Sequence, residues 1–461
     1  MARADGILQG APLDALRQRH RGPLLLPGDD GYDAARAVWN GMIDRRPAVI
    51  ARCRGPADVM AAVDAARTAG LPVSVRGGGH NVGGKAVCDG GVMLDLTAMR
   101  WVHVDPERRR ARAGGGTLWG DFDHEAQAFG LTCTGGVVST TGVAGLTLGG
   151  GIGYLTRRHG LACDNLLSAD LVTADGRLVH ASDDRNPELM WALRGGGGNF
   201  GVVTSLEFQL HPVGPEVAAA VVFYPIDQAE DVLRRYRTYA EAAPDAIACY
   251  AMVVNAPPDL PAEHQGRPVL AIVGCHADDV DAGRELLQPV AGFGRPIAAV
   301  IDAMPYTALQ TSFDAGNPTG QRYYWKSQHL TGLPDELIDA VCRYARDLHG
   351  DFTIIGIEPL GGAQGRVPPD ATAFPHRSVP FSLGIWTGWA DPAADRDNVA
   401  WTRDFFAAVQ PFGAGAYVNY LGDDEADRVG EAYGGNMARL VEIKRRWDPD
   451  NLFRVNHNIA P

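Results

Sequence analysis

The sequence lacks any long hydrophobic run. No apolar stretch approaches the roughly 20 residues that a membrane-spanning helix needs, and the short run 24–26 lies between Pro23 and Pro27, which is unlike a signal peptide. Positive charge is also in short supply, with 42 Lys and Arg against 55 Asp and Glu and a net charge of −13. Nucleic-acid affinity depends on basic side chains that neutralise phosphates. We therefore expect a cytoplasmic protein that binds neither membrane nor nucleic acid.

Cysteine is scarce and scattered. The seven cysteines are odd in number, and no two of them stand two or three residues apart. Zinc sites and redox pairs need closely spaced cysteines, so we predict no metal site and expect small, buried thiols. Apolar content of 46% and charged content of 21% are ordinary for a globular protein, and 461 residues predict two or three domains.

Glycine, by contrast, is abundant and clustered, with 57 in the chain. The densest loop, residues 76–84, follows the strand-like run 73–75 and contains one histidine, His80. Glycine lets backbone N–H groups approach a phosphate closely, since no Cβ stands in the way. The loop therefore predicts a cofactor site, with His80 where the cofactor would lie.

Two glycine patterns resemble nucleotide-binding motifs, but the residues and elements around them do not match those motifs. Residues 79–85 read G-x-x-x-x-G-K, but Ala86 stands where a Ser or Thr would hold magnesium, and a strand follows in place of a helix. Residues 196–201 read G-x-G-x-x-G, but a helix precedes them and a strand follows, the reverse of a dinucleotide fold. Neither a phosphate loop nor a Rossmann fold is favoured.

The periodicity predicts α+β structure on both sides of a boundary at residues 211–215. Thr117 is the expected N-cap of a helix that runs to about residue 128. We expect helices near 56–69, 117–128, 187–194, 228–243, 280–287, 335–348, 395–409 and 425–444, and strands near 73–75, 92–96, 167–173, 177–180, 202–210, 217–224, 248–254, 268–275, 352–358 and 381–389. The second half is expected to be an antiparallel sheet with helices on one face.

Four segments together resemble one known family: residues 74–80, 142–165, 189–203, and the C-terminal 417–420 with 447–453. They are similar to the covalent flavoproteins typified by berberine bridge enzyme, in the vanillyl-alcohol oxidase superfamily, and most of all to bacterial oxidases of secondary metabolism and nicotine-degrading oxidases. The resemblance implies an α+β fold with a bipartite PCMH-type FAD-binding domain. That domain would comprise residues 1–213 (core about 42–213) and the returning segment 415–461, around a central substrate domain, 214–414, with an antiparallel sheet.

The resemblance also implies FAD, bonded covalently through His80 to the flavin 8-methyl carbon. An imidazole is a suitable nucleophile for that bond, although a histidine that only hydrogen-bonds its loop remains the alternative. Relatives with a second, cysteinyl link carry it at the position of Val138, and Cys133 does not align, so one link is predicted. The implied FAD-binding residues are Arg76, Gly77, Gly78, Gly79, His80, Asn81, Gly84, Thr141, Gly142, Gly145, Gly149, Gly150, Gly153, Tyr154, Asn199, Gly201, Val203, Tyr417, Asn419 and Asn456.

The catalytic base in many relatives is the second tyrosine of a Tyr-x-Asn-Tyr segment, here Tyr420. A free tyrosine has a pKa of about 10, so something must lower it or share the charge; a packed strand tyrosine is the alternative. Other relatives use a glutamate on the strand after Pro-His-Arg, but residues 381–389 carry no carboxylate. Glu358 is the second candidate for the acid or base, and the alternative is that it is only a solvated glutamate at the end of a strand. Trp386 and Trp389 would line an aromatic pocket or pack in the core.

The function that follows is an FAD-linked oxidase that oxidises a C–OH or C–N centre of a small molecule, with O₂ as acceptor and H₂O₂ as product, in secondary metabolism or small-molecule catabolism. A flavin dehydrogenase with another electron acceptor and a non-catalytic flavin-binding protein are the alternatives. Neither the substrate nor the oligomeric state is predicted.

Overall fold

The glycine loop lies at the carboxyl edge of a small parallel sheet. The computed structural model describes residues 10–461, and its first sheet has the order β1-β2-β4-β3, in which β2, β4 and β3 are parallel and β1 is antiparallel. Helix α3 (Pro56–Ala69) begins with proline in its first turn and ends at Gly70 in the left-handed region. The strands are β1 (Leu24–Leu25), β2 (Val49–Arg52), β3 (Val73–Arg76) and β4 (Val92–Asp95), with α1 (Ala11–Arg19) and α2 (Tyr32–Arg36) nearby.

The second sheet is antiparallel and carries the other glycine-rich loops. Its order is β5-β6-β10-β8-β9, and β7 pairs separately with β11. These strands are β5 (Val102–Asp105), β6 (Arg110–Gly114), β7 (Leu131–Thr132), β8 (Leu166–Val172), β9 (Leu178–Ser182), β10 (Val202–Gln209) and β11 (His211–Pro212). The helices among them are α4 (Trp119–Gln127), α5 (Val143–Leu148), α6 (Thr156–His159) and α7 (Pro187–Leu193).

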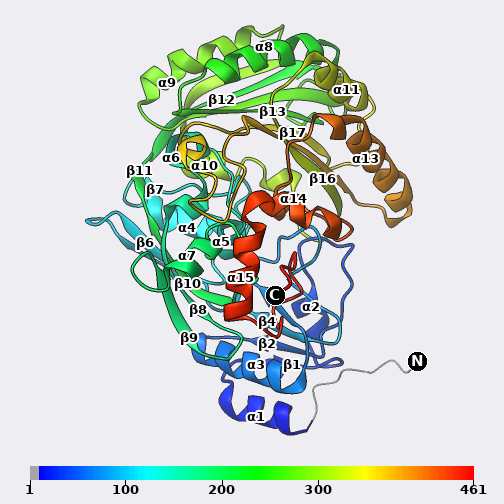
Figure 1. Ribbon diagram of the computed structural model, residues 1–461. Coiled ribbons are helices and arrows are strands. Elements are labelled where there is room, and N and C mark those ends of the chain that lie inside the picture. The colour runs from blue at the N-terminus through cyan, green and yellow to red at the C-terminus, as the bar shows by residue number, and fades with distance from the viewer. Residues whose placement is uncertain (1–9) are drawn as a thin grey trace.

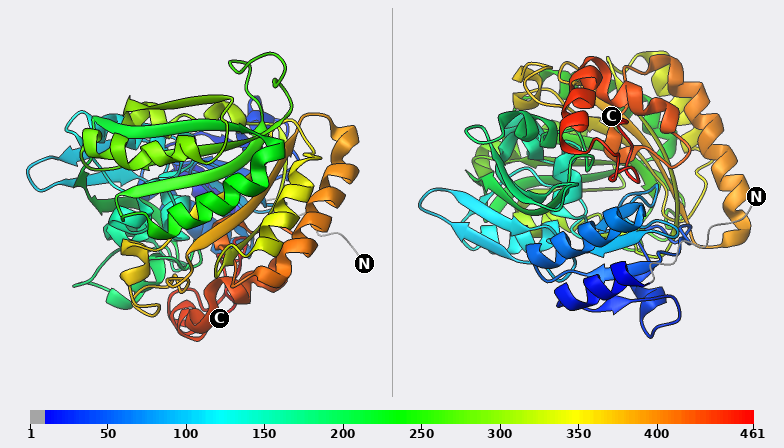
Figure 2. Two further views of the ribbon diagram at one scale, coloured as in Figure 1. Left: turned by 90° about the horizontal axis from the view of Figure 1, so that it is seen from above. Right: turned by 60° about the horizontal axis from the view of Figure 1, so that its bottom comes forward.

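The third sheet has seven antiparallel strands in the order β15-β12-β14-β13-β17-β18-β16. They are β12 (Glu216–Pro225), β13 (Ile247–Asn255), β14 (Pro268–His276), β15 (Ala298–Pro305), β16 (Arg322–Leu330), β17 (Ile354–Pro359) and β18 (Phe381–Trp389). Four helices cover one face (Figures 1 and 2): α8 (Ala229–Ala242), α9 (Val280–Leu287), α11 (Asp335–Ala345) and α13 (Asp395–Val409). The shorter α10 (Tyr306–Gln310) and α12 (Ala363–Arg366) lie in connections.

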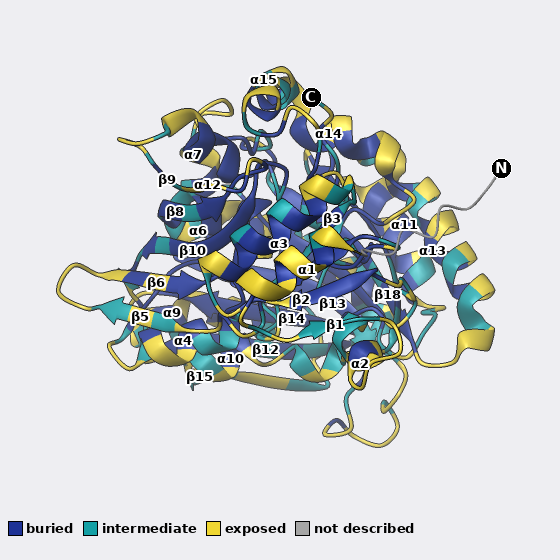
Figure 3. Ribbon diagram, turned by 90° about the horizontal axis from the view of Figure 1, so that it is seen from below, coloured by how far each residue is buried: buried dark blue, intermediate teal, exposed yellow. Residues whose placement is uncertain are grey.

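The two faces of the third sheet have different partners because side chains alternate along a strand. One set, such as Leu383 and Ile385, packs under the helices. The outer faces of these helices are exposed, as Figure 3 shows for α11 and α13 at the side of the molecule. The other set, such as Tyr250 and Met252, packs against Tyr154 from the second sheet's loops. This arrangement confirms the predicted antiparallel sheet with helices on one face.

The C-terminal segment returns to the first half of the chain. Helices α14 (Val429–Tyr433) and α15 (Met437–Trp447) follow the third sheet, and α15 lies beside α7 (Figure 1). The Lys444 ammonium is completely buried there and donates to the Asp448 carboxylate at 2.7 Å and to the carbonyls of Asn199 and Phe453. Asp448 accepts two backbone N–H groups in turn, from Leu452 and Phe453. Every proton of the ammonium therefore has an acceptor.

Some predicted elements differ in the structure. Helix α4 begins at Trp119, and Thr117 is not its N-cap, because the Thr117 hydroxyl instead bonds the backbone of Trp101. The single helix expected at 425–444 is interrupted at Gly434, whose φ of 45° ends α14. The two edge strands of the third sheet, β15 and β16, were not predicted. In the first half of the chain, β2, β5 and β6 and the short strands β1, β7 and β11 were not predicted either.

The domain boundaries at residues 213 and 414 stay predictions. The structure shows that the first two sheets use residues 24–209, that the third uses 216–389, and that α15 packs on the earlier part. Among residues 10–461, every helix is too short or too polar to cross a membrane.

Replacing Lys444 with methionine tests the buried ion pair. The variant leaves the Asp448 charge without its cation, and breaking a buried pair in this way costs about 3–5 kcal/mol. We expect the free energy of unfolding, followed by denaturant titration with far-UV circular dichroism, to fall by that amount. Arg445→Met, an exposed change on the next residue of α15, should leave it nearly unchanged. An equal loss in both variants would show that the pair has no special role.

Candidate functional site

A cavity lies between the first two sheets and the third. Backbone from the glycine loops forms much of one wall, and apolar side chains from the third sheet form the other. The residues that line it are Val75, 77–81, Lys85, Ala86, Leu96, Gly115, 136–138, Thr141, Gly142, 144–146, Leu148, Ile152, 197–199, Gly201, Val203, Met252, Phe313, Asn317, Trp325, Ile354, Trp386, 418–420, Tyr433, Asn456 and His457.

Most of the predicted site residues meet at this cavity. Segments far apart in the sequence contribute to it, including the loop at 77–81 and the C-terminal turn at 418–420. The predicted residues on its wall are Gly77, Gly78, Gly79, His80, Asn81, Thr141, Gly142, Gly145, Asn199, Gly201, Val203, Asn419, Tyr420 and Asn456. Those behind the wall are Arg76, Gly84, Gly149, Gly150, Gly153, Tyr154, Tyr417 and Glu358.

Three of the glycines behind the wall make room for neighbours. A Cβ on Gly149 would lie 2.0 Å from Oδ1 of Asn419, and one on Gly153 would lie 1.7 Å from the Gly135 carbonyl oxygen. Gly84 packs closely against Ile43. These positions shape the loops without facing the cavity.

The side chains behind the wall have their own contacts. Arg76 donates to the carbonyl of Ala35 at 2.6 Å. The Tyr154 ring packs edge-on against Tyr250 of the third sheet, at 5.2 Å between centroids. The Tyr417 hydroxyl accepts the N–H of Gly151 at 2.8 Å and supports the loop from beneath.

The two main glycine loops touch backbone to backbone. A Cβ on Gly78 would lie 2.4 Å from the Gly142 nitrogen, and a Cβ on Gly142 would lie 2.5 Å from the Gly78 nitrogen. Gly145 instead has nothing within 4 Å of the position of a Cβ and faces open space. At this contact the loops present bare backbone, which forms a cradle that the phosphates of a flavin dinucleotide can approach closely.

His80 is a buried, neutral imidazole on the cavity wall. Burial lowers its pKa to about 4, and within residues 10–461 its Nε2 has no hydrogen-bond partner. The ring stacks on Trp39, with centroids 4.3 Å apart and planes 19° apart. Trp39 in turn stacks on Tyr323 of β16 at 3.7 Å and donates its indole N–H to the Asn317 carbonyl. The imidazole is thus held in one orientation by a stack that reaches the third sheet.

Tyr420 and Glu358 form a buried pair. The Tyr420 hydroxyl, in a 3₁₀ turn at Val418–Tyr420 and not in a strand, donates to Oε1 of Glu358 at 2.9 Å. Burial raises the pKa of Glu358 to about 7. Burial and then the Glu358 charge raise the pKa of Tyr420 well above 10. Glu358 is therefore not a solvated glutamate, because it is buried and accepts a hydrogen bond from Tyr420, the other candidate base.

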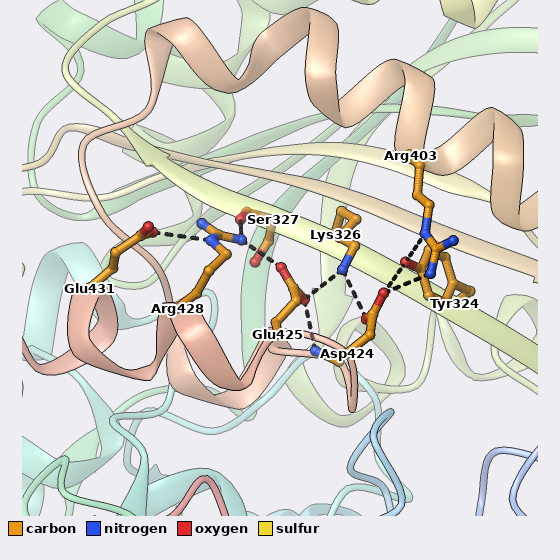
Figure 4. Close-up of polar contacts among 9 residues, drawn as sticks. Tyr324, Lys326, Ser327, Arg403, Asp424, Glu425, Arg428 and Glu431 are labelled. Carbon is orange, nitrogen blue, oxygen red and sulfur yellow. Dashed lines mark hydrogen bonds and ion pairs between the residues drawn. The ribbon is translucent and has the colours of Figure 1, made fainter.

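Ion pairs on the far side of Tyr420 fix its segment to β16. Lys326 donates to Asp424 at 3.0 Å and lies 3.3 Å from Glu425, which also accepts from Arg428 (Figure 4). Glu425 also accepts the backbone N–H of Gly422. Asp423 pairs separately with Lys85 and Arg45, next to the first glycine loop. The turn that carries Tyr420 is therefore anchored to both halves of the molecule.

Several site residues escaped sequence reasoning. Trp39 lies outside every motif, and its role depends on contacts with residues more than 40 positions away. The acidic run 423–425, which begins three residues after Tyr420, was the available signal for the anchoring pairs. Trp386 does line the cavity, whereas Trp389, three residues on, lies on the opposite face and donates to Asp395.

Comparison with known proteins agrees with this geometry. The "FAD binding domain" family matches residues 47–182, and the "Berberine and berberine like" family matches residues 416–460. The chain is 32% identical over 457 residues to (R)-6-hydroxynicotine oxidase of Paenarthrobacter nicotinovorans, covering 96% of this chain and 97% of that protein.

Solved structures share the fold. The crystal structure of 6-hydroxy-D-nicotine oxidase from Arthrobacter nicotinovorans superposes with a TM-score of 0.84 at 31% identity, covering 96% of this chain and 98% of that one. Glucooligosaccharide oxidase from Acremonium strictum, described with a 6-S-cysteinyl, 8α-N1-histidyl FAD, gives 0.86 at 24% identity, covering 98% and 99%. The cavity, its cradle and these relatives together show that the chain is an FAD-dependent oxidoreductase of the berberine bridge enzyme-like family.

Proposed function

We propose that the protein oxidises a C–OH or C–N centre of a small molecule, with FAD held covalently by His80 and with O₂ as the final acceptor, giving H₂O₂. The observation that carries the proposal is the Tyr420–Glu358 pair, which stands at the cavity that also holds His80. FAD, when bound, supplies a two-electron acceptor. The protein supplies the cradle, the tether and the base.

The environment of His80 supports the covalent link. A neutral imidazole keeps a lone pair for bond formation, and burial keeps this imidazole neutral. Trp39 acts as a positioning residue, because its stack limits the rotation of the His80 ring. Val138 lines the cavity without a thiol, and Cys133 is buried outside the cavity wall, which supports a single link.

The pair at Tyr420 supports proton removal from the substrate. A tyrosinate would be costly here, since burial and the Glu358 charge both raise the Tyr420 pKa. Glu358 can take the proton instead, because its pKa of about 7 is close to neutral pH. As the substrate's O–H or N–H proton moves to Tyr420, the phenolic proton moves to Glu358. The proton that leaves the substrate is thus stored on Glu358, and Tyr420 is neutral before and after the transfer.

We also propose a cytoplasmic location. All seven cysteines are buried and unpaired, which is the usual state of thiols in a reducing compartment. The net charge of −13 suits a protein that works without a polyanionic partner.

Replacing His80 with alanine should abolish covalent attachment. After acid precipitation, we expect the flavin of the wild-type protein in the pellet and that of His80→Ala in the supernatant. His103→Ala, a change at an exposed histidine, should keep the flavin in the pellet. Free flavin from the wild-type protein would contradict the link.

Trp39→Ala should lower the fraction of protein that carries covalent flavin, since the His80 ring loses its stack. Flavin fluorescence of the denatured protein on a gel, against total protein, measures this fraction. Trp39→Phe keeps an aromatic surface and should restore most of it. A full covalent fraction in Trp39→Ala would remove Trp39 from the set of positioning residues.

The rate of flavin reduction by substrate should rise as pH increases through about 7, because the carboxylate form of Glu358 accepts the proton and is lost below its pKa. Glu358→Gln should remove this step and slow reduction, and Tyr420→Phe should slow it about 10²–10⁴-fold. Anaerobic stopped-flow absorbance across pH 5–9 measures both effects. A pH step retained in Glu358→Gln would assign it to another group.

Formation of H₂O₂ tests the acceptor. In air, we expect one equivalent of peroxide for each equivalent of substrate oxidised, measured by a coupled peroxidase assay. Turnover that needs an added quinone or dye, with no peroxide in air, would make the protein a dehydrogenase.

A further inference from the structure

Two glycines face each other in the middle of the third sheet. Gly356 of β17 and Gly384 of β18 are paired in the strand register. Glycine inside a strand weakens it and marks a place where something must approach the backbone closely. Here the approaching group belongs to the chain itself.

The indole of Trp386 lies across this glycine pair. A Cβ on Gly384 would lie 2.1 Å from Cε2 of the indole, and a Cβ on Gly356 would lie 2.4 Å from its Cζ3. Both contacts are too short for any side chain larger than hydrogen. Opposite ends of one ring therefore lie over two neighbouring strands, so the indole is flat against the sheet while Trp386 lines the cavity.

The surrounding wall is aromatic and apolar. Trp325 stands 6.2 Å from Trp386 with planes 55° apart, and Tyr420 stands 5.3 Å away with planes 70° apart. Met252, Phe313 and Ile354 complete this side.

Polar groups are rare on the same wall. Between residues 216 and 389, all of which the structure describes, the polar groups on the lining side chains are the Asn317 amide and the indole N–H groups of Trp325 and Trp386. The Asn317 amide N–H already donates to the Phe313 carbonyl. A sugar has hydroxyls around its ring and needs a partner for each one buried. A flat aromatic ring needs only a surface on which to stack.

We propose that the substrate presents a flat aromatic or heteroaromatic ring that stacks on Trp386, with its oxidisable C–OH or C–N group directed to Tyr420. This assignment rests on the proposed function and names the substrate class for the same site. The glycine pair then determines specificity, because the absence of two Cβ atoms lets the indole lie close to the sheet. This leaves room in the cavity for the ring of the substrate.

Binding of quinoline to the flavin-loaded protein tests the proposal without turnover. We expect a saturable change in the flavin absorbance spectrum with quinoline and none with xylobiose at the same concentration. Gly384→Ala keeps every aromatic side chain but displaces the indole, and should raise the dissociation constant for quinoline at least tenfold. Trp386→Leu should raise the same dissociation constant by a similar factor. It replaces Gly384→Ala in the test if that variant does not fold.

The matched control is Trp389→Phe, which alters a second indole on β18 that faces away from the cavity. It should bind quinoline as the wild-type protein does. Unaltered affinity in Trp386→Leu, or xylobiose binding as tight as that of quinoline, would overturn the proposal. Reduction of the flavin by xylobiose, with no effect of quinoline, overturns the aromatic assignment and leaves the proposed oxidation intact. Quinoline binding that depends on Trp386 supports the assignment whether or not any compound reduces the flavin.

Discussion

The buried ion pair between Lys444 and Asp448 ties the C-terminal segment to a loop of the cavity wall. The Lys444 ammonium also binds the Asn199 carbonyl, in a loop that lines the cavity, while Asp448 orders the turn that leads to Asn456 and His457. A buried charge is tolerated only with complete hydrogen bonding, so the C-terminal segment has one acceptable position. The turn that carries Tyr420 lies earlier in the chain and is held separately, by the ion pairs of Asp423, Asp424 and Glu425.

At the cavity, burial favours the uncharged form of each working group. Burial is the largest influence on the pKa of His80, of Glu358 and of Tyr420, and in each case it favours the neutral form. The consequences differ because the ordinary pKa values differ. His80 becomes a neutral nucleophile, Tyr420 becomes unable to hold a charge, and Glu358 alone moves to the boundary at which a small change of pH alters its state. Burial thus gives these three residues their different roles.

The sequence predicted those features whose cause is local. The glycine loops, the α3 helix with its proline and glycine ends, and the alternating strands of the third sheet all depend on neighbouring residues. Edge strand β16 (Arg322–Leu330) was missed because its sequence is interrupted by many polar residues. Edge strand β15 (Ala298–Pro305) was missed because its sequence is apolar apart from Asp302 and shows no alternation, and none of its residues is fully buried. Tyr420 and Glu358 were separate candidates, because nothing in a linear sequence shows that residues 62 positions apart share a hydrogen bond. The Trp39 stack and the indole across the glycine pair depend on tertiary contacts in the same way.

The cavity wall includes Asn456 and His457, near the end of the chain, as well as Val75, near its beginning. During synthesis, the loop with His80 emerges from the ribosome long before the residues that close the pocket around it. The pocket around that loop is therefore incomplete on the nascent chain until residues 456 and 457 have emerged. A chain truncated before residue 456 would lack part of the wall that encloses the flavin.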